Sequence, residues 1–261
     1  MTEIEPDQPN SARIYNYMLG GKDYFPADVA AAQKLIKASP YFQPASKENR
    51  HFLRRAVQYL TGLGITQFLD IGTGLPTNGN VHEVAPDSRV VYVDNDPVVL
   101  IHAQALMADT DRVRVVAGDV RDPKHILTDP TVRDFLDWDQ PIGLLMISVL
   151  HFVSDEDGAH EAVAQFRDAM PPGSYLAISH GSLDGFEEER GEKIEKVYQR
   201  STQQASLRPK AGILRFFGDC PLVEPGLVSI PRWHPDGVTE GMPPERIGIY
   251  GGIGQMSSTG V

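Results

Sequence analysis

The sequence holds a single cysteine, Cys220, among 261 residues. One cysteine forms no internal disulfide and builds no cysteine-ligated zinc site. Chains of this length bury enough surface to fold without such cross-links. The cysteine content therefore predicts a protein of the reducing cytoplasm.

Long apolar runs are also missing. No segment reaches the run of about 18 or more apolar residues that a membrane-spanning helix requires. The first ten residues carry three acids and two prolines, unlike the basic and apolar regions of a signal peptide. We therefore expect no contact with a membrane.

Basic residues are scarce relative to acidic ones. The chain has 24 Lys and Arg against 35 Asp and Glu, a formal net charge of −11. Proteins that bind nucleic acids usually carry a basic footprint for the phosphate backbone, so we expect no nucleic-acid partner. The densest basic cluster is Arg50, His51, Arg54 and Arg55. Its helical spacing beside apolar residues indicates a solvated helix face.

Helical patterns fill the first 60 residues. Residues 12–37 predict two helices joined at an elbow, Gly20-Gly21. Ser46 is predicted to cap a third helix that ends at Gly62 or Gly64. We interpret residues 1–62 as a loose tail followed by a helical cap.

Short apolar runs then alternate with helical stretches. The runs cover residues 67–71, 89–93, 113–117, 142–149 and 175–179. Continuous apolar runs fit strands buried on both faces, and their alternation with helices predicts βαβ units in a doubly wound parallel sheet. Two later runs, 222–230 and 247–253, predict an antiparallel pair at the sheet edge. Residues 63–261 are thus expected to form one α/β unit of Rossmann-like type.

A charged amphipathic helix is expected at residues 186–207, between these two groups of strands. Its acidic and basic side chains indicate a solvated outer face. We expect the helix to form one wall of a ligand pocket. A homodimer contact is the alternative for the same helix.

The first predicted strand ends in a glycine turn with Asp70, Gly72 and Gly74. Such a turn lets the backbone approach a nucleotide, and the next helix offers free N–H groups. The dinucleotide fingerprint needs a third glycine where this chain has Thr77. The Asp70 carboxylate would repel a pyrophosphate but would suit the ammonium of an amino-acid moiety. Both details favour S-adenosylmethionine over NAD, with a plain tight turn as the alternative.

Acidic residues also end the second and third predicted strands. Asp94, followed by Asn95, lies 22 residues after Gly72. From that position a carboxylate accepts the two ribose hydroxyls. Asp119 and Val120 suit an adenine, because the carboxylate accepts from the amino group and the valine packs on the ring. Each acid alone also fits a cap or a turn, but three at successive strand ends predict an adenosyl site.

The fourth predicted strand ends near Ser148 and His151. The strand order of such sheets reverses at this point and ligands bind there, so a methyl acceptor would approach these side chains. A hydroxyl acceptor needs a general base, and His151 and His180 are the candidates. A structural role is the alternative for each histidine. No paired spacing of ligand residues predicts a metal site.

Residues 9–25, PNSARIYNYMLGGKDYF, resemble the N-terminal signature of a bacterial, mostly actinobacterial, family of S-adenosylmethionine-dependent methyltransferases. The glycine turn at residues 70–76 is similar to that family, with Pro76 where others have a third glycine. Similar segments are ISH at 178–180, RFF at 215–217, LVEPGL at 222–227 and YGGIG at 250–254. The resemblance covers nearly the whole chain. It departs at residues 218–221, where an Asp-Gly-Leu-like turn is expected.

That resemblance implies the class I methyltransferase fold, a seven-stranded sheet whose last strand is antiparallel. It also implies cofactor contacts at Asp70, Gly72, Asp94, Asp119 and Ser148. It does not imply a substrate, because the acceptors of the family are largely unassigned.

The N-terminal segment also carries candidate ligand contacts. Arg13 is predicted to hold the methionine carboxylate through two hydrogen bonds, and Gly21 permits close backbone approach. Tyr15 and Tyr17 are two residues apart and cannot share one helix face. We expect one of them to close over the cofactor and choose Tyr15. The alternative is a helix–turn–helix that merely packs on the sheet edge.

The sequence therefore predicts an enzyme that moves the methyl group of S-adenosylmethionine to oxygen or nitrogen of a small-molecule acceptor by in-line displacement. A regulatory protein that binds S-adenosylmethionine without transferring its methyl group is one alternative. An NAD-dependent oxidoreductase is the other, and Asp70 and the missing third glycine argue against it.

Overall fold

The computed structural model describes residues 5–77, 79–107, 110–184, 205–237 and 243–256. Its centre is a seven-stranded sheet in the order β3-β2-β1-β4-β5-β7-β6. The strands are β1 (Gln67–Ile71), β2 (Arg89–Asp94), β3 (Val113–Ala117), β4 (Gly143–Ile147), β5 (Tyr175–Gly181), β6 (Val228–Ser229) and β7 (Ile249–Gln255). The first five pair in parallel, whereas β7 runs antiparallel to both β5 and β6. The predicted fold class is confirmed.

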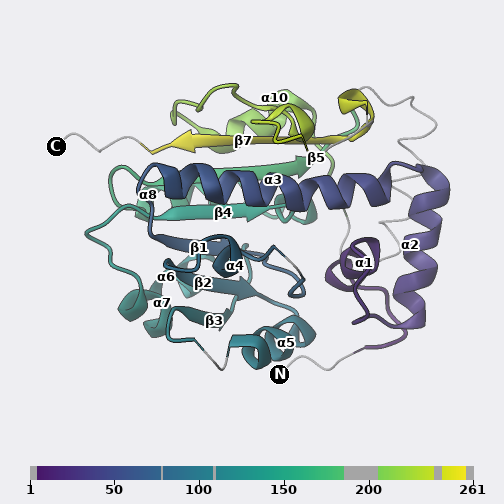
Figure 1. Cartoon of the computed structure of the whole chain (residues 1–261), viewed down its shortest axis with the longest axis horizontal. Helices are drawn as coiled ribbons and strands as arrows, with labels where there is room; N and C mark the ends of the chain where they lie inside the picture. The colour runs from purple at the N-terminus through teal and green to yellow at the C-terminus, as the bar shows by residue number, and fades with distance from the viewer. Residues whose placement is uncertain (1–4, 78, 108–109, 185–204, 238–242, 257–261) are drawn as a thin grey trace.

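Helices cover both faces of the sheet (Figure 1). The long helices are α1 (Ser11–Met18), α2 (Pro26–Ala38), α3 (Phe42–Gly62), α5 (Pro97–Met107) and α8 (Ala159–Ala169). The short helices are α4 (Val81–Val84), α6 (Pro123–Thr128), α7 (Pro130–Phe135) and α10 (Lys210–Leu214). Single 3₁₀ turns are η1 (Leu150–Phe152), η2 (Arg215–Phe217), η3 (Ile230–Arg232) and η4 (Pro244–Arg246).

Alternation along the strands builds a separate core on each face, because successive side chains point to opposite sides. In β1, Leu69 and Ile71 join the cluster formed with α6, α7 and α8. Phe68 joins the cluster formed with α3 and η3. Asp70 shares the side of Phe68, so its carboxylate lies on the side that α3 covers.

Helix α3 crosses one face of the sheet and is anchored at the far edge (Figure 1). The buried Arg55 guanidinium pairs with the Glu48 carboxylate at 2.7 Å. It also donates to the carbonyl oxygens of Ile230 and Trp233 at 2.8 and 2.9 Å. These contacts fix the position of α3 relative to η3. Figure 1 places α1 and α2 beyond the carboxyl ends of the parallel strands.

Three predicted boundaries were wrong. Helix α3 begins at Phe42, so Ser46 is inside it and its hydroxyl donates to the Phe42 carbonyl at 3.0 Å instead of capping the helix. The run 222–230 forms only the two-residue β6 and a single bridge at Leu222, because Pro225 offers no N–H and Gly226 has φ +84°. Strand β4 ends at Ile147, since Ser148 takes φ +56°.

The helix predicted at 186–207 falls mainly outside the described residues. Residues 205–209, which are described, form no helix. Within the parts of the chain given above, no helix has both the length and the apolar character needed to cross a membrane.

Candidate functional site

A cavity of about 680 Å³ opens at the carboxyl ends of the parallel strands. This volume is in the range of small-molecule sites. We divide the cavity by the strands that line it. The β1–β3 half contains Asp70, Gly72, Gly74, Asp94, Asn95, Asp119 and Val120. The β4–β5 half contains Tyr15, Asn49, Ser148, His151, Phe152, Leu207 and Ile249.

Asp70 lies one residue before the end of β1, inside this cavity, and the residue is 4% exposed. Burial raises the pKa of Asp70 to about 7, and the nearby Asp94 adds to the rise. The Arg50 guanidinium and a hydrogen bond from the Thr73 hydroxyl at 3.3 Å oppose it. Because a buried carboxylate favours a cation beside it, Asp70 fits an ammonium group.

Asp94 holds the glycine turn in place. One carboxylate oxygen accepts from the Gly74 backbone N–H and the other from that of Asp96, both at 2.9 Å. Burial raises the pKa of Asp94 to about 6 despite these bonds. Gly72 has φ +73°, and a Cβ there would meet the Val149 side chain at 2.3 Å. The turn therefore requires glycine at that position.

Asp119 lies at the outer end of the β1–β3 half. Its carboxylate accepts from the Asn95 side-chain amide at 2.9 Å and from the Arg121 guanidinium at 2.9 and 2.5 Å. Burial acts to raise the pKa of Asp119, but the hydrogen bonds from Arg121 outweigh it and lower the value to about 2. Val120 is beside it, so a carboxylate and an apolar contact are adjacent on the cavity wall.

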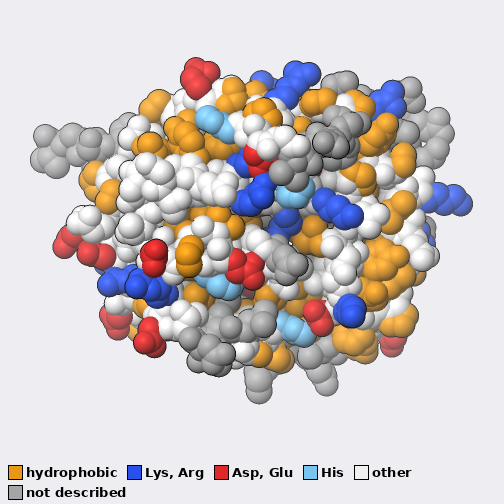
Figure 2. Space-filling model, in the orientation of Figure 1, with side chains coloured by type: hydrophobic (Ala, Val, Ile, Leu, Met, Phe, Trp, Pro, Cys, Tyr) orange, Lys and Arg blue, Asp and Glu red, His pale blue; other side chains and the backbone are white. Residues whose placement is uncertain are grey.

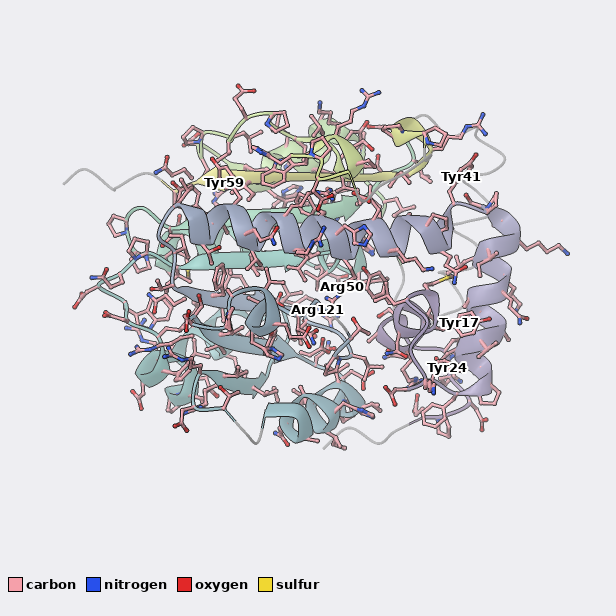
Figure 3. All side chains as sticks on the ribbon, viewed as in Figure 1. Tyr17, Tyr24, Tyr41, Arg50, Tyr59 and Arg121 are labelled. Carbon is pink, nitrogen blue, oxygen red and sulfur yellow. The ribbon has the colours of Figure 1, made fainter. Side chains whose placement is uncertain are left out.

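Arg50 is a cavity residue that the sequence analysis assigned to a solvated face. Its guanidinium donates to the Thr77 hydroxyl at 2.9 Å and to the Asn80 side-chain carbonyl at 2.7 Å. Its Nε is buried and has no hydrogen-bond partner in the described residues. Arg50 and Arg121, which also lines the cavity, are labelled near the strand ends in Figure 3. Arg50 therefore adds a positive charge close to Asp70.

The rest of the basic cluster on α3 is paired. Arg54 forms an ion pair with Asp236, and Arg55 is buried against Glu48. Figure 2 shows basic side chains gathered over the middle of this face, where α3 lies. The fourth member, His51, has its Nδ1 3.5 Å from the Glu48 carboxylate. The cluster thus combines one cavity residue, two anchors of the fold and a histidine beside Glu48.

Arg13 and Gly21 do not line the cavity. The Arg13 Nε donates to the fully buried Asp28 carboxylate at 2.8 Å, and Arg13 also donates to the carbonyl oxygens of Glu5 and Gln8. A Cβ at Gly21 would lie 2.3 Å from Asn16 Oδ1. The structure places both residues away from the cavity: Arg13 joins α1 to α2, and Gly21 makes room for Asn16.

Tyr15 is the tyrosine of the pair that reaches the cavity. Its hydroxyl donates to the Ser46 carbonyl and accepts from the Asn49 side-chain amide, both at 2.9 Å. Tyr17 instead packs edge-to-face against Tyr24, with ring centroids 5.1 Å apart (Figure 3). The spacing argument that the two rings face different surroundings is consistent with this arrangement.

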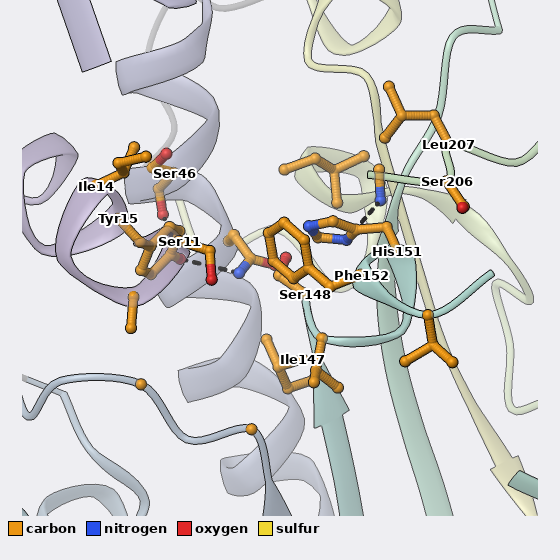
Figure 4. A pocket seen from close by; sticks show the side chains of 18 of the residues that line it. Ser11, Ile14, Tyr15, Ser46, Ile147, Ser148, His151, Phe152, Ser206 and Leu207 are labelled. Atoms are coloured by element: carbon orange, nitrogen blue, oxygen red, sulfur yellow. Dashed lines mark hydrogen bonds between the residues drawn. The ribbon is translucent and has the colours of Figure 1, made fainter. Parts of the chain in front are cut away.

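His151 lines the β4–β5 half between Ser148 and Leu207 (Figure 4). Burial and the nearby Arg208 lower the pKa of His151 to about 3. The ring is therefore neutral at neutral pH. Its Nδ1 accepts a long hydrogen bond, 3.5 Å, from the Gly181 backbone N–H, so Nε2 carries the proton.

His180 is fully buried and does not line the cavity. Its Nε2 lies 2.9 Å from an Arg208 guanidinium nitrogen, which can only donate. Its Nδ1 therefore carries the proton and donates to the Gly181 carbonyl at 2.7 Å. Both ring nitrogens are occupied, and burial lowers the pKa of His180 well below its usual value. These contacts favour a structural role for His180 over the predicted role as a base.

Arg208 explains the fixed position of this loop. Its buried guanidinium donates to the Asp155 carboxylate at 2.6 and 2.9 Å and to the carbonyl oxygens of Leu150 and Val153. It thereby ties the turn after β4 to His180 on β5. Among the described residues, no group of three or more His, Cys, Asp or Glu is arranged to hold a metal ion.

The family model and two similar structures agree on the family of this chain. A family model described as S-adenosyl methyltransferase matches residues 1–257. A DUF574 family protein from Streptomyces avermitilis is 42% identical, with a TM-score of 0.93 over 97% of this chain and 99% of that one. A second similar structure, of a protein from Thermobifida fusca, is 39% identical, with a TM-score of 0.89 over 97% of this chain and 96% of that one.

A more distant structure shares the fold alone. It is the N-methyltransferase NodS from Bradyrhizobium japonicum in complex with S-adenosyl-L-homocysteine. The identity is 14% and the TM-score 0.51, over 82% of this chain and 88% of that one. The comparison with curated proteins finds no match.

Proposed function

Because the chain belongs to the S-adenosyl methyltransferase family, we propose that it methylates a small molecule bound in the β4–β5 half of the cavity. The cofactor of the family is S-adenosylmethionine, which supplies an activated methyl group on a sulfonium. The observation that carries the proposal is the row of three carboxylates, Asp70, Asp94 and Asp119, which continues into a second half of different chemistry.

The residues near β1 fit the amino-acid end of the cofactor. Asp70 is proposed to accept hydrogen bonds from the ammonium group. Arg50, in place of Arg13, is proposed to bind the carboxylate, since its buried Nε has no partner among the described residues. An unsatisfied buried donor is unfavourable, and a carboxylate would satisfy it.

The residues at β2 and β3 fit the adenosine. Asp94 is proposed to accept from the ribose hydroxyls while it holds Gly74, and Gly72 permits the turn. Asp119 is proposed to accept from the adenine amino group. Its carboxylate has about four acceptor sites, and Asn95 and Arg121 occupy them with four hydrogen bonds, so the amino group would replace one of these donors. Val120 would pack on the ring.

The protein would contribute mainly proximity and alignment. A sulfonium methyl group needs no further activation, and well-oriented reactants gain up to about 7–11 kcal/mol. Tyr15, Ser148 and His151 line the half of the cavity next to this proposed cofactor site. Their fixed hydrogen bonds would orient an acceptor without rearrangement.

Calorimetric titration tests the cofactor site. The wild-type protein is titrated with S-adenosylmethionine, its demethylated product and NAD, and the series is repeated with Asp94→Ala. We expect micromolar binding of the two adenosyl compounds, a loss of about tenfold to a thousandfold in the variant, and no binding of NAD. Asp157→Ala, a change on the cavity rim, is the control and retains affinity. Equal binding by Asp94→Ala and wild type would contradict the assignment.

A further inference from the structure

Four side chains form one hydrogen-bonded row along the β4–β5 half. The Tyr15 hydroxyl lies 2.9 Å from the Ser46 carbonyl, and the Asn49 amide nitrogen lies 2.9 Å from the Tyr15 hydroxyl. The Ser179 hydroxyl lies 2.6 Å from Asn49 Oδ1 and 3.3 Å from the Ser148 hydroxyl. Asn49 and Ser179 are almost completely buried. The row thus connects a helix carbonyl to a side chain of the cavity wall.

The carbonyl at one end of this row fixes the direction of every hydrogen bond in it. The Ser46 carbonyl can only accept, so Tyr15 donates its single proton there. Tyr15 must then accept from the Asn49 NH₂ group, which turns Asn49 Oδ1 toward Ser179. Ser179 therefore donates to Asn49, and its oxygen is left to accept from Ser148. The Ser148 hydroxyl therefore donates its proton to Ser179 and not to a ligand in the cavity.

Ser148 consequently offers the cavity an acceptor and no donor. Its φ of +56° is unusual for serine and places it at the turn where β4 ends. Ser148 lies between the proposed cofactor site at β1 and the β5 side of the cavity, because β4 separates these strands in the sheet. Figure 4 shows it between Tyr15 and His151. A bound acceptor molecule would have to donate a hydrogen bond to satisfy it.

Among the described residues that line this half of the cavity, no histidine or buried carboxylate is free to act as a base, and Glu156 is exposed on the loop after η1. His180 has no free ring nitrogen, and the proton of His151 is on Nε2. Asp70 is assigned to the ammonium of the cofactor, and Asp157 interacts with Arg121 and the Ser154 hydroxyl. A hydroxyl acceptor gains about 10²–10⁴-fold from a base. An ammonium group instead loses its proton to water before the reaction, and the neutral amine then carries its own lone pair.

We propose that the acceptor is an amine, whose N–H donates to the Ser148 oxygen. This inference rests on the proposed function and names its substrate class. The nitrogen lone pair forms the new N–CH₃ bond while the C–S bond breaks and leaves its electrons on sulfur. The extra proton on the methylated nitrogen then passes to water. Ser179 and Asn49 act as positioning residues, because they commit the Ser148 proton.

The test uses the full chain saturated with S-adenosylhomocysteine and three probes of equal size. Benzylamine and benzyl alcohol both donate a hydrogen bond, whereas benzaldehyde only accepts. Benzyl alcohol is uncharged and therefore controls for the positive charge of benzylamine at neutral pH. Binding is measured by calorimetry or by ligand-observed NMR. We expect benzylamine to bind about tenfold more tightly than benzaldehyde, as one hydrogen bond of about 1.4 kcal/mol provides. With a methyl-labelled donor, label is expected on benzylamine rather than on benzyl alcohol.

Variants distinguish the role of the row in ligand preference from general effects on folding. Ser179→Ala releases the Ser148 proton and is expected to abolish the preference for benzylamine, and Ser148→Ala abolishes it as well. Ser182→Ala also changes a cavity serine but lies outside the row, so the preference remains. Binding of S-adenosylhomocysteine checks that each variant is folded.

Three results would overturn the amine assignment: benzaldehyde binding as tightly as benzylamine, label only on benzyl alcohol, or no binding of benzylamine to the saturated protein. Each of these results counts only for protein that is shown to bind S-adenosylhomocysteine. If S-adenosylhomocysteine does not bind to the wild type, the proposed function itself fails, and the amine assignment fails with it.

Discussion

The two halves of the cavity are built in different ways. In the β1–β3 half, each carboxylate lies at the end of its own strand, next to the turn that positions it. In the β4–β5 half, the side chains come from α1, α3, the turn after β4, the segment around Leu207 and the start of β7. The first half depends on local turn chemistry, and the second on segments that only tertiary packing brings together.

Because of this difference, the two halves differ in the range of ligands that they accept. Strand-end carboxylates and a glycine turn suit any ligand with an ammonium, a ribose and an adenine. The row from Tyr15 to Ser148 suits only a ligand that donates at one point. Changes in the two halves should therefore alter cofactor affinity and acceptor choice separately.

The largest expected effect lies outside both halves, at Arg13. Arg13→Met leaves the fully buried Asp28 carboxylate unpaired, which should lower the free energy of unfolding by about 3–5 kcal/mol. Denaturant unfolding measures the loss. The double variant Arg13→Met, Asp28→Leu should recover part of it. A stable Arg13→Met variant with weakened S-adenosylmethionine binding would instead restore the predicted carboxylate contact.

Arg50→Met should weaken S-adenosylhomocysteine binding by about tenfold to a hundredfold, because a hydrogen bond to a charged group contributes about 1.5–3 kcal/mol. The matched ligand is 5′-methylthioadenosine, which lacks the amino-acid end and should bind wild type and variant equally. Calorimetry with both ligands makes the comparison. Equal losses for both would mean that Arg50 only supports the turn through Thr77 and Asn80.

Asp70 should link stability, affinity and pH. Its pKa is about 7 in the folded protein against an ordinary 3.8, so the folded state holds the proton more tightly. The contribution of Asp70 to the free energy of unfolding should therefore fall as pH rises from about 4 to 7, and then level off. Asp94, with a pKa of about 6, adds a similar loss that ends near pH 6.

Affinity should run the other way, because the ammonium group needs an ionised Asp70. Binding of S-adenosylmethionine should weaken by up to about tenfold for each pH unit below about 7. Asp70→Asn should raise Tm at pH 8 and lower affinity at the same pH. Thermal unfolding and calorimetry across this range check both signs. Buried neutral His151 and His180 favour the folded state as pH rises over the same range, so the decisive quantity is the Tm difference between Asp70→Asn and the wild type. A difference that does not grow as pH rises toward 7 would contradict the reasoning.

The smallest effect is expected at His151. A ring with a pKa of about 3 is neutral throughout the pH range of the assay. His151→Gln should therefore change the turnover number with an amine acceptor by less than about tenfold. The pH profile should show no inflection that disappears in the variant. A loss of about a hundredfold with cofactor affinity intact would return His151 to the role of base.

The sequence predicted the parallel strands and all three strand-end acids, because buried strands and turn residues leave local patterns. Arg50 was missed because a basic cluster on a helix usually faces water. A signal was available: Asn49 and Arg50 extend the stripe of Phe52, Leu53 and Val57 by one turn. Arg13 was misassigned because its partner Asp28 lies on a different helix, and no local pattern announces such a pair.

Some expectations stay predictions. The division at residue 62, the cytoplasmic location, the absence of a nucleic-acid partner and a homodimer contact belong to this group. The helix at 186–207 lies mostly outside the described residues, so its proposed part in the pocket wall rests on the sequence.

Asn49 and Arg50 are neighbours on α3, yet one belongs to each half of the cavity. Successive residues of a helix project about 100° apart, so a single rigid rod carries a contact for the donor and a contact for the acceptor. Any drift of α3 would misalign both substrates at once. The hydrogen bonds from Arg55 to η3 therefore keep the methyl donor and the acceptor aligned with each other, although Arg55 contacts neither of them.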